Sequence, residues 1–167
     1  MPESNGSPSA AERTPSASGM LLAVYGRVFG VPEDALVELR ATEKDGEIWA
    51  SSQDPPRRVR TRRPPGLRAL RRMPDGVKPT STFLMALADR IRAARIEVDL
   101  ETLRKLLLGR RIEVDHPDSY VAVAYDGLVL GCGRVQRSEL HVLIPTGRRR
   151  ELLEVLEART PPQVTKL

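Results

Sequence analysis

Four short runs of β-branched and apolar residues follow one another in the C-terminal half of the chain. They occupy residues 112–114, 120–125, 128–135 and 140–145. The segments between them, DHPDS, DG and QRSE, consist of residues that favour turns. Short strands at this spacing are typical of a small antiparallel barrel or a curled sheet. Gly131 and Gly133 interrupt the third run, which predicts a bulge or a tight corner there.

Helices are expected on both sides of these strands. Residues 80–94 carry apolar side chains at helical spacing, and Ser81 or Thr82 can cap the first turn. A short strand at 96–99 and a helix that Gly109 ends should follow. Residues 147–159 predict a closing helix, and the three arginines at the start of this segment are expected to precede the first helical turn.

The N-terminal half has a different pattern. Residues 21–29 predict an amphipathic helix that Gly30 ends, and residues 31–35 predict a turn. Residues 36–43 and 47–51 alternate as two strands of a hairpin around an Asp-Gly turn. Residues 66–73 fit a strand or one helical turn, and the strand is favoured.

These patterns predict an α+β fold in which a small N-terminal α/β lobe packs on a mixed β-barrel. The expected limits are a disordered tail at 1–18, the lobe at 19–78, the barrel domain at 79–158 and a frayed end at 159–167. The tail is rich in Ser, Pro, Ala and Glu and has no large apolar residue after Met1, so it cannot bury enough surface to fold.

A basic strip is the strongest functional signal. Residues 57–72 contain eight arginines and no acid, and residues 57–78 together carry a local charge of +8, whereas the whole chain carries +5. Such a strip attracts polyanions, and arginine grips phosphate oxygens in pairs and stacks on bases. Leu67 and Leu70 should anchor the strip in the fold. The alternatives are a solubilising loop and a genomic bias toward arginine codons.

Several function classes look excluded. The absence of a long apolar run argues against a membrane span, so a cytoplasmic protein is expected. Cys132, His116 and His141 lack partners at metal-site or triad spacing, so neither a metal nor another cofactor is expected. Cys132, between two glycines of an apolar run, should pack rather than react. Tyr25 and Trp49 could stack on an RNA base, but packing in the core is favoured for both.

The segments KPT, LLLGRRIEV, YVAVAYDGLVLGCGRV and LHVLIPTGRR, in this order, carry a family likeness. They resemble the C-terminal RNA-binding region of the Sun-type RNA cytosine-5 methyltransferases, above all the RsmF-like branch, over about residues 20–150. The resemblance implies a pseudouridine-synthase-and-archaeosine-transglycosylase (PUA) domain preceded by a small α/β segment. Thr146 stands where the family usually has a lysine. The sequence shows neither the S-adenosylmethionine domain nor the Pro-Cys motif of the methyltransferases, so we expect a protein that is not an enzyme.

The expected function is therefore binding of structured RNA, either tRNA or rRNA. The alternative is an RNA-binding subunit or interaction partner of a separately encoded RNA methyltransferase, and a second rival is an unrecognised enzyme that uses Cys132. The predicted RNA-binding residues are Arg57, Arg58, Arg60, Arg62, Arg63, Arg68, Arg71, Arg72, Lys78, Arg110, Arg111, Arg134, Arg148 and Arg149.

Overall fold

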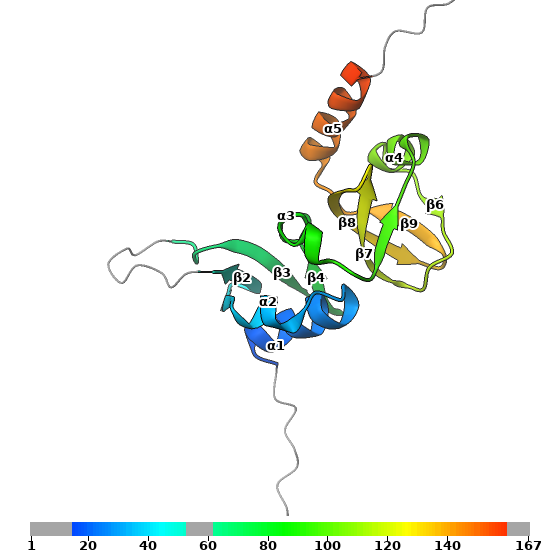
Figure 1. Cartoon of the computed structure of the whole chain (residues 1–167). Coiled ribbons are helices and arrows are strands. Elements are labelled where there is room, and N and C mark those ends of the chain that lie inside the picture. The colour runs from blue at the N-terminus through cyan, green and yellow to red at the C-terminus, as the bar shows by residue number, and fades with distance from the viewer. Residues whose placement is uncertain (1–14, 53–61, 160–167) are drawn as a thin grey trace, which may run out of the picture.

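The structure is a computed structural model that describes residues 15–52 and 62–159. Within these residues the chain forms a four-stranded sheet and a five-stranded sheet, with helices around both (Figure 1). The fold is mixed α+β, as predicted from the sequence. The expected tail at 1–18 and the frayed end at 159–167 fall almost entirely outside the described residues, and the predicted domain limits stay predictions.

The N-terminal helix begins with α1 (Ala17–Leu21), whose N-cap Ser16 accepts a hydrogen bond from the Gly19 amide at 3.1 Å. It continues as a π-helix, η1 (Leu22–Val28), and the predicted end is confirmed because Gly30 adopts a positive φ of 64°. The turn expected at 31–35 is wrong. A short helix, α2 (Glu33–Val37), starts there after Pro32, and the two acids of its first turn, Glu33 and Asp34, suit the positive end of the helix dipole.

The first sheet is antiparallel, in the order β1 (Arg40–Lys44), β2 (Glu47–Ser51), β3 (Leu67–Met73) and β4 (Gly76–Pro79). The predicted hairpin is confirmed, since Asp45 and Gly46 both have positive φ, as a tight turn between β1 and β2 requires. Its first strand is shorter than predicted, because residues 36 and 37 belong to α2 and the strand begins at Arg40. The strand favoured for residues 66–73 is also confirmed. The π-helix and α2 lie on one face of this sheet (Figure 1).

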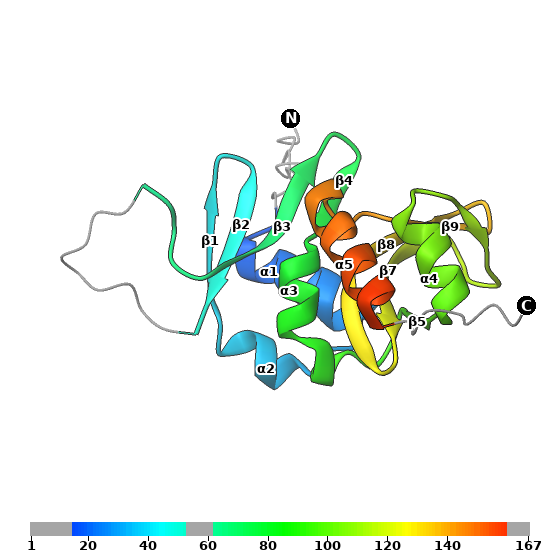
Figure 2. The same ribbon diagram turned by 90° about the horizontal axis from the view of Figure 1, so that it is seen from above.

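α3 (Ser81–Ala86) lies between the two sheets (Figure 2). The predicted helix over 80–94 is too long, since only a short 3-10 turn, η2 (Ala88–Arg90), follows α3. Beyond it, the amides of Arg92 and Ala93 both donate to the Phe29 carbonyl at 3.0 Å, so a tertiary contact replaces helical hydrogen bonds. The predicted caps are also wrong, because the Thr80 hydroxyl accepts from the Phe83 amide whereas Ser81 accepts from the Cys132 amide.

The second sheet has the order β5-β7-β8-β9-β6 and curls into a half-barrel. Its strands are β5 (Arg95–Glu97), β6 (Ile112–Glu113), β7 (Ser119–Tyr125), β8 (Leu128–Gln136) and β9 (Glu139–Val142). β5 pairs with β7 in parallel and the other pairs are antiparallel, so the sheet is mixed. The predicted helices α4 (Leu100–Leu107) and α5 (Thr146–Arg159) are confirmed.

The bulge predicted from the glycines of β8 is confirmed. Val123 pairs with Gly131 and Ala124 with Val129, which leaves Leu130 as the extra residue. A Cβ at Gly131 would lie 2.7 Å from the Ile144 side chain, and one at Gly133 would lie 2.8 Å from both Leu140 and Val123. Both glycines are therefore needed for space.

Two apolar clusters hold these layers together, and β7 contributes to both. Ala122 and Ala124 face the cluster that contains Tyr25 and the first sheet, whereas Val121 and Val123 face the cluster under α4. The Tyr25 hydroxyl donates to the Ala69 carbonyl at 2.6 Å. The core position favoured for Tyr25 is thus confirmed. No helix in the described part of the chain is long and apolar enough to cross a membrane.

Candidate functional site

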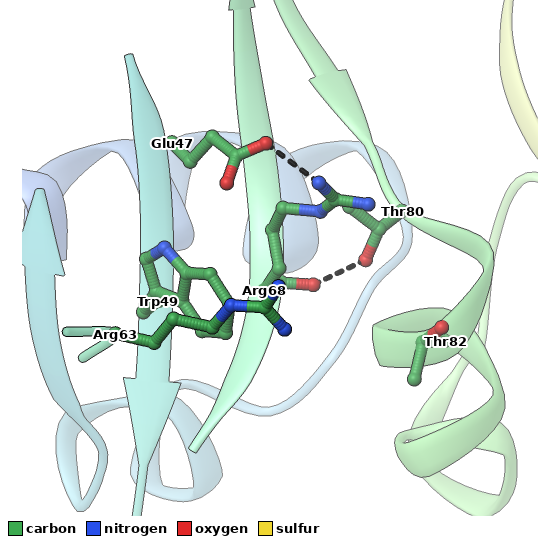
Figure 3. Close-up of a pocket in the computed structure, with 6 residues that line it drawn as sticks. All are labelled: Glu47, Trp49, Arg63, Arg68, Thr80 and Thr82. Atoms are coloured by element: carbon green, nitrogen blue, oxygen red, sulfur yellow. Dashed lines mark hydrogen bonds and ion pairs between the residues drawn. The ribbon is translucent and has the colours of Figure 1, made fainter. Parts of the chain in front are cut away.

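A hollow of about 390 Å³ opens on the outer face of the first sheet, beside the start of α3 (Figure 3). In β2, Ile48 and Ala50 point into the core, so the alternation of the strand turns Glu47 and Trp49 outward. Arg68 lies opposite Trp49 on β3. The residues lining this hollow are Glu47, Trp49, Arg63, Arg68, Thr80 and Thr82.

Hydrogen bonds fix the walls of this hollow. Arg68 Nη1 donates to Glu47 Oε1 at 2.6 Å, in an ion pair that is partly exposed to solvent. The Thr80 hydroxyl donates to the Arg68 carbonyl and also caps α3. The strand that carries Arg68 and the helix that carries Thr82 are therefore tied together at one residue, Thr80.

A second hollow, of about 210 Å³, adjoins the first and shares Arg68, Thr80 and Thr82 with it. Arg71 and Lys78 line it and face each other across β3 and β4. Within the described part of the chain, neither of these two cations has an acidic partner. This pair is thus available to an anionic ligand.

The basic surface continues onto the second sheet around His141. Burial, and then the nearby positive charges of Arg111, Arg134 and Lys78, hold the pKa of His141 below its usual value. Arg134 lies opposite His141, its guanidinium sits 5.2 Å from the centre of the Tyr120 ring, and its Nη2 lies 3.9 Å from Asp75 Oδ2. Because Lys78 belongs to the first sheet and Arg134 to the second, both sheets contribute to one basic surface.

The structure gathers part of the predicted RNA-binding set. Arg63, Arg68, Arg71 and Lys78 line the hollows, and Arg111 and Arg134 lie with Lys78 around His141. Arg111 also pairs with Glu139, at 3.2 Å. Arg62 is exposed, in the segment 62–66 that leads into β3. The remaining loop residues Arg57, Arg58 and Arg60 lie outside the described residues.

Other members of the set lie elsewhere. Arg110 is exposed beyond the end of α4. Arg148 and Arg149 lie in the first turn of α5, so the expectation that the arginines precede this helix is wrong. Arg148 pairs with Glu151, and Arg149 donates to the Thr146 hydroxyl.

The strip itself contains no acid, but acids from another part of the first sheet pair with two of its arginines. Arg68 pairs with Glu47, and Arg72 pairs with Glu43, whose pKa the Arg72 guanidinium lowers. Both acids come from the β1–β2 hairpin, which the sheet places beside β3. A count of charge along the sequence cannot find partners that strand pairing supplies.

Two predicted core positions are also corrected. Leu67 is 40% exposed, whereas Leu70 is fully buried as expected. A bulge between β2 and β3 makes consecutive residues, Ala69 and Leu70, face the core, which breaks the expected alternation. Trp49 is only partly buried and lines the hollow instead of the core. The alternation of Ile48 and Ala50 around Trp49 was the sequence signal for this.

Cys132 is 1% exposed, and burial raises the pKa of its thiol to about 12. A thiol in this state is a poor nucleophile, which agrees with the predicted packing role. Searched over 15–52 and 62–159, the structure brings no three His, Cys, Asp or Glu residues together in a way that could hold a metal ion.

Residues 93–150 match the family described as the methyltransferase RsmF PUA domain. A search of curated proteins gave no match. The matched segment contains β5 to β9 and α4, so the half-barrel is PUA-like, and the match supports RNA as its partner. The six residues that line the larger hollow all precede the matched segment.

Proposed function

We propose that this chain is a non-catalytic RNA-binding protein that recognises structured RNA, either tRNA or rRNA, in the cytoplasm. The observation that carries the proposal is the basic surface that joins the two hollows to the PUA-like half-barrel through Lys78. The match to a PUA domain indicates RNA as the class of partner. Arg71 and Lys78 are two cations that form no ion pair with an acid in the described part of the chain, so they can bind phosphates.

The mechanism is electrostatic. Arginine and lysine side chains on this surface bind phosphates and release the counterions condensed on the RNA. Arg68 contributes even though it is paired, since its bond to Glu47 uses Nη1 and leaves its other donors to the ligand. Because the deep groove of an RNA duplex is closed to side chains, a folded RNA with a single-stranded edge fits this surface best.

The test compares two double variants that each remove two positive charges. Replacing Arg71 and Lys78 by glutamine should weaken binding of tRNA or an rRNA fragment and reduce the log-log salt slope by up to about one unit per lost contact. Replacing Arg90 and Arg92, which are exposed and line neither hollow, is the matched control. Equal affinity and equal slope for both variants would show that RNA binds elsewhere or not at all.

A second function follows from the name of the matched family. The chain could supply RNA affinity in trans to a separately encoded RNA methyltransferase, because the PUA domain that it matches is that of a methyltransferase. Co-purification with such an enzyme, and faster methylation of its RNA when the chain is added, would support this role. Sequencing of RNA crosslinked to the chain in cells identifies the target in either case.

A further inference from the structure

We propose that the hollow beside Trp49 holds one unpaired nucleotide of the bound RNA, with its base stacked on the indole. This inference rests on the proposed function and adds a site to it. The site lies on the first sheet and therefore outside the matched PUA segment at 93–150.

Trp49 is the first argument for a base. The aromatic residues Tyr25, Phe29 and Phe83 are buried together, whereas Trp49 stands on the opposite face of β2 and lines an open hollow. A large aromatic ring that is left partly in water gains free energy when a flat apolar partner covers it. Every base has such a face, and stacking on aromatic side chains is the common way to hold unpaired bases.

Glu47 is the second argument, because its carboxylate would repel a phosphate. The base, and not the phosphate, must therefore lie against Glu47. Its Oε1 accepts from Arg68, and its Oε2 accepts no hydrogen bond from the described residues. Glu47 Oε2 can therefore accept hydrogen bonds from donors on the edge of a base bound in the hollow. Guanine presents two neighbouring donors, N1–H and the amino group, and Oε2 has two lone pairs with which to accept them, so we expect guanine to bind best.

The cations around the hollow are the third argument. Arg63 and Arg68 line the same hollow as Trp49, and Arg71 and Lys78 line the adjoining one. When a base stacks on Trp49, the phosphate of that nucleotide and the next phosphate of the RNA therefore lie close to these cations. The volume of about 390 Å³ also falls in the range of small-molecule sites, about 300 to 1,000 Å³.

The chain offers a direct probe of this site, because Trp49 is its single tryptophan. The probes are two oligomers of seven nucleotides whose other six positions are abasic, one with guanosine at the centre and one with an abasic residue there as well. The guanosine oligomer should quench the tryptophan fluorescence and bind at least about fivefold more tightly than the abasic oligomer. Both carry the same phosphates, so the difference reports the base alone.

Three variants separate stacking from structure. Trp49→Phe should keep most of the affinity, whereas Trp49→Leu should lose about 5- to 100-fold with an unchanged melting temperature. Glu47→Gln should reduce the preference for guanosine over uridine at the central position, even though it releases Arg68 and can raise the overall affinity.

The outcomes are distinguishable. If the chain binds tRNA or rRNA but the two oligomers bind equally and leave the fluorescence unchanged, the nucleotide site is wrong and the proposed function stands. If no RNA binds, both are wrong. An unaltered guanosine preference in Glu47→Gln would overturn the role of the carboxylate.

Discussion

Gly133 offers a sharp test of how tightly β8 is packed. A Cβ at this position would lie 2.8 Å from Leu140 Cδ1, 2.8 Å from Val123 Cγ2 and 3.3 Å from the His141 carbonyl oxygen. These neighbours belong to β7 and β9 on either side, and both apolar side chains are fully buried. The added methyl group of Gly133→Ala thus has to displace packed core atoms.

The cost follows from two opposing terms. Overpacking a core costs about 1 to 3 kcal/mol. The smaller conformational freedom of unfolded alanine offsets about 0.4 to 1 kcal/mol, because Gly133 does not have a positive φ. Gly133→Ala should therefore destabilise the protein by about 1 to 2 kcal/mol, which lowers Tm by roughly 2 to 8 °C in a domain of this size. Valine, which adds two further methyl groups, should cost more.

Urea unfolding followed by circular dichroism measures this cost. Gly147→Ala is the matched control, since a Cβ there meets no atom within 4 Å and the residue lies in α5, where alanine is favourable. The Gly133→Ala cost should also shrink by about 0.5 kcal/mol or more in a Val123→Ala background, because the methyl group then has space. A loss of stability equal in both backgrounds, or equal to that of the control, would refute the packing argument.

Three further predictions concern the loop, the thiol and the buried tyrosine. Replacing Arg58, Arg60, Arg62 and Arg63 by glutamine should weaken RNA binding at low salt and lower the salt slope, with unchanged melting; wild-type affinity and slope would show that these arginines do not bind RNA. Cys132 should react with a thiol reagent at pH 8 only after unfolding, because burial raises its pKa to about 12, and Cys132→Ser should bind RNA normally. Tyr25→Phe should cost only about 0.5 to 1.5 kcal/mol in urea unfolding, since the Ala69 carbonyl keeps the Thr80 amide as a donor; a cost above 3 kcal/mol would contradict this.

The sequence predicts the half-barrel well because its strands are short and its turns are local. Asp126 and Gly127 join β7 to β8 with positive φ, and Gly109 ends α4 in the same way. Each of these turn and cap signals depends on residues only a few positions apart, so it can be read from the sequence without the tertiary structure. The same holds for the Asp45–Gly46 turn of the first hairpin.

The errors arise where distant segments decide. The helix from residue 80 stops early because the Phe29 carbonyl takes the amides of Arg92 and Ala93. Arg68 and Arg72 find acids on strands more than 20 residues earlier in the chain. The hollow could not be predicted at all, since it requires β2, β3 and the start of α3 to meet.

The position of the candidate nucleotide site depends on the packing between the two sheets. The Thr80 hydroxyl donates a hydrogen bond to the Arg68 carbonyl and accepts one from the Phe83 amide, which caps α3. The hydroxyl of the next residue, Ser81, accepts a hydrogen bond from the Cys132 amide of β8. The first sheet, α3 and the half-barrel are therefore connected through two successive residues at the edge of the hollow. Because Phe83 and Leu84 bury the other side of α3, a shift of this helix would move Thr82 relative to Trp49. The same contacts that hold the half-barrel against the first sheet thus set the width of the hollow and its distance from the half-barrel, as the proposed binding of one RNA to both requires.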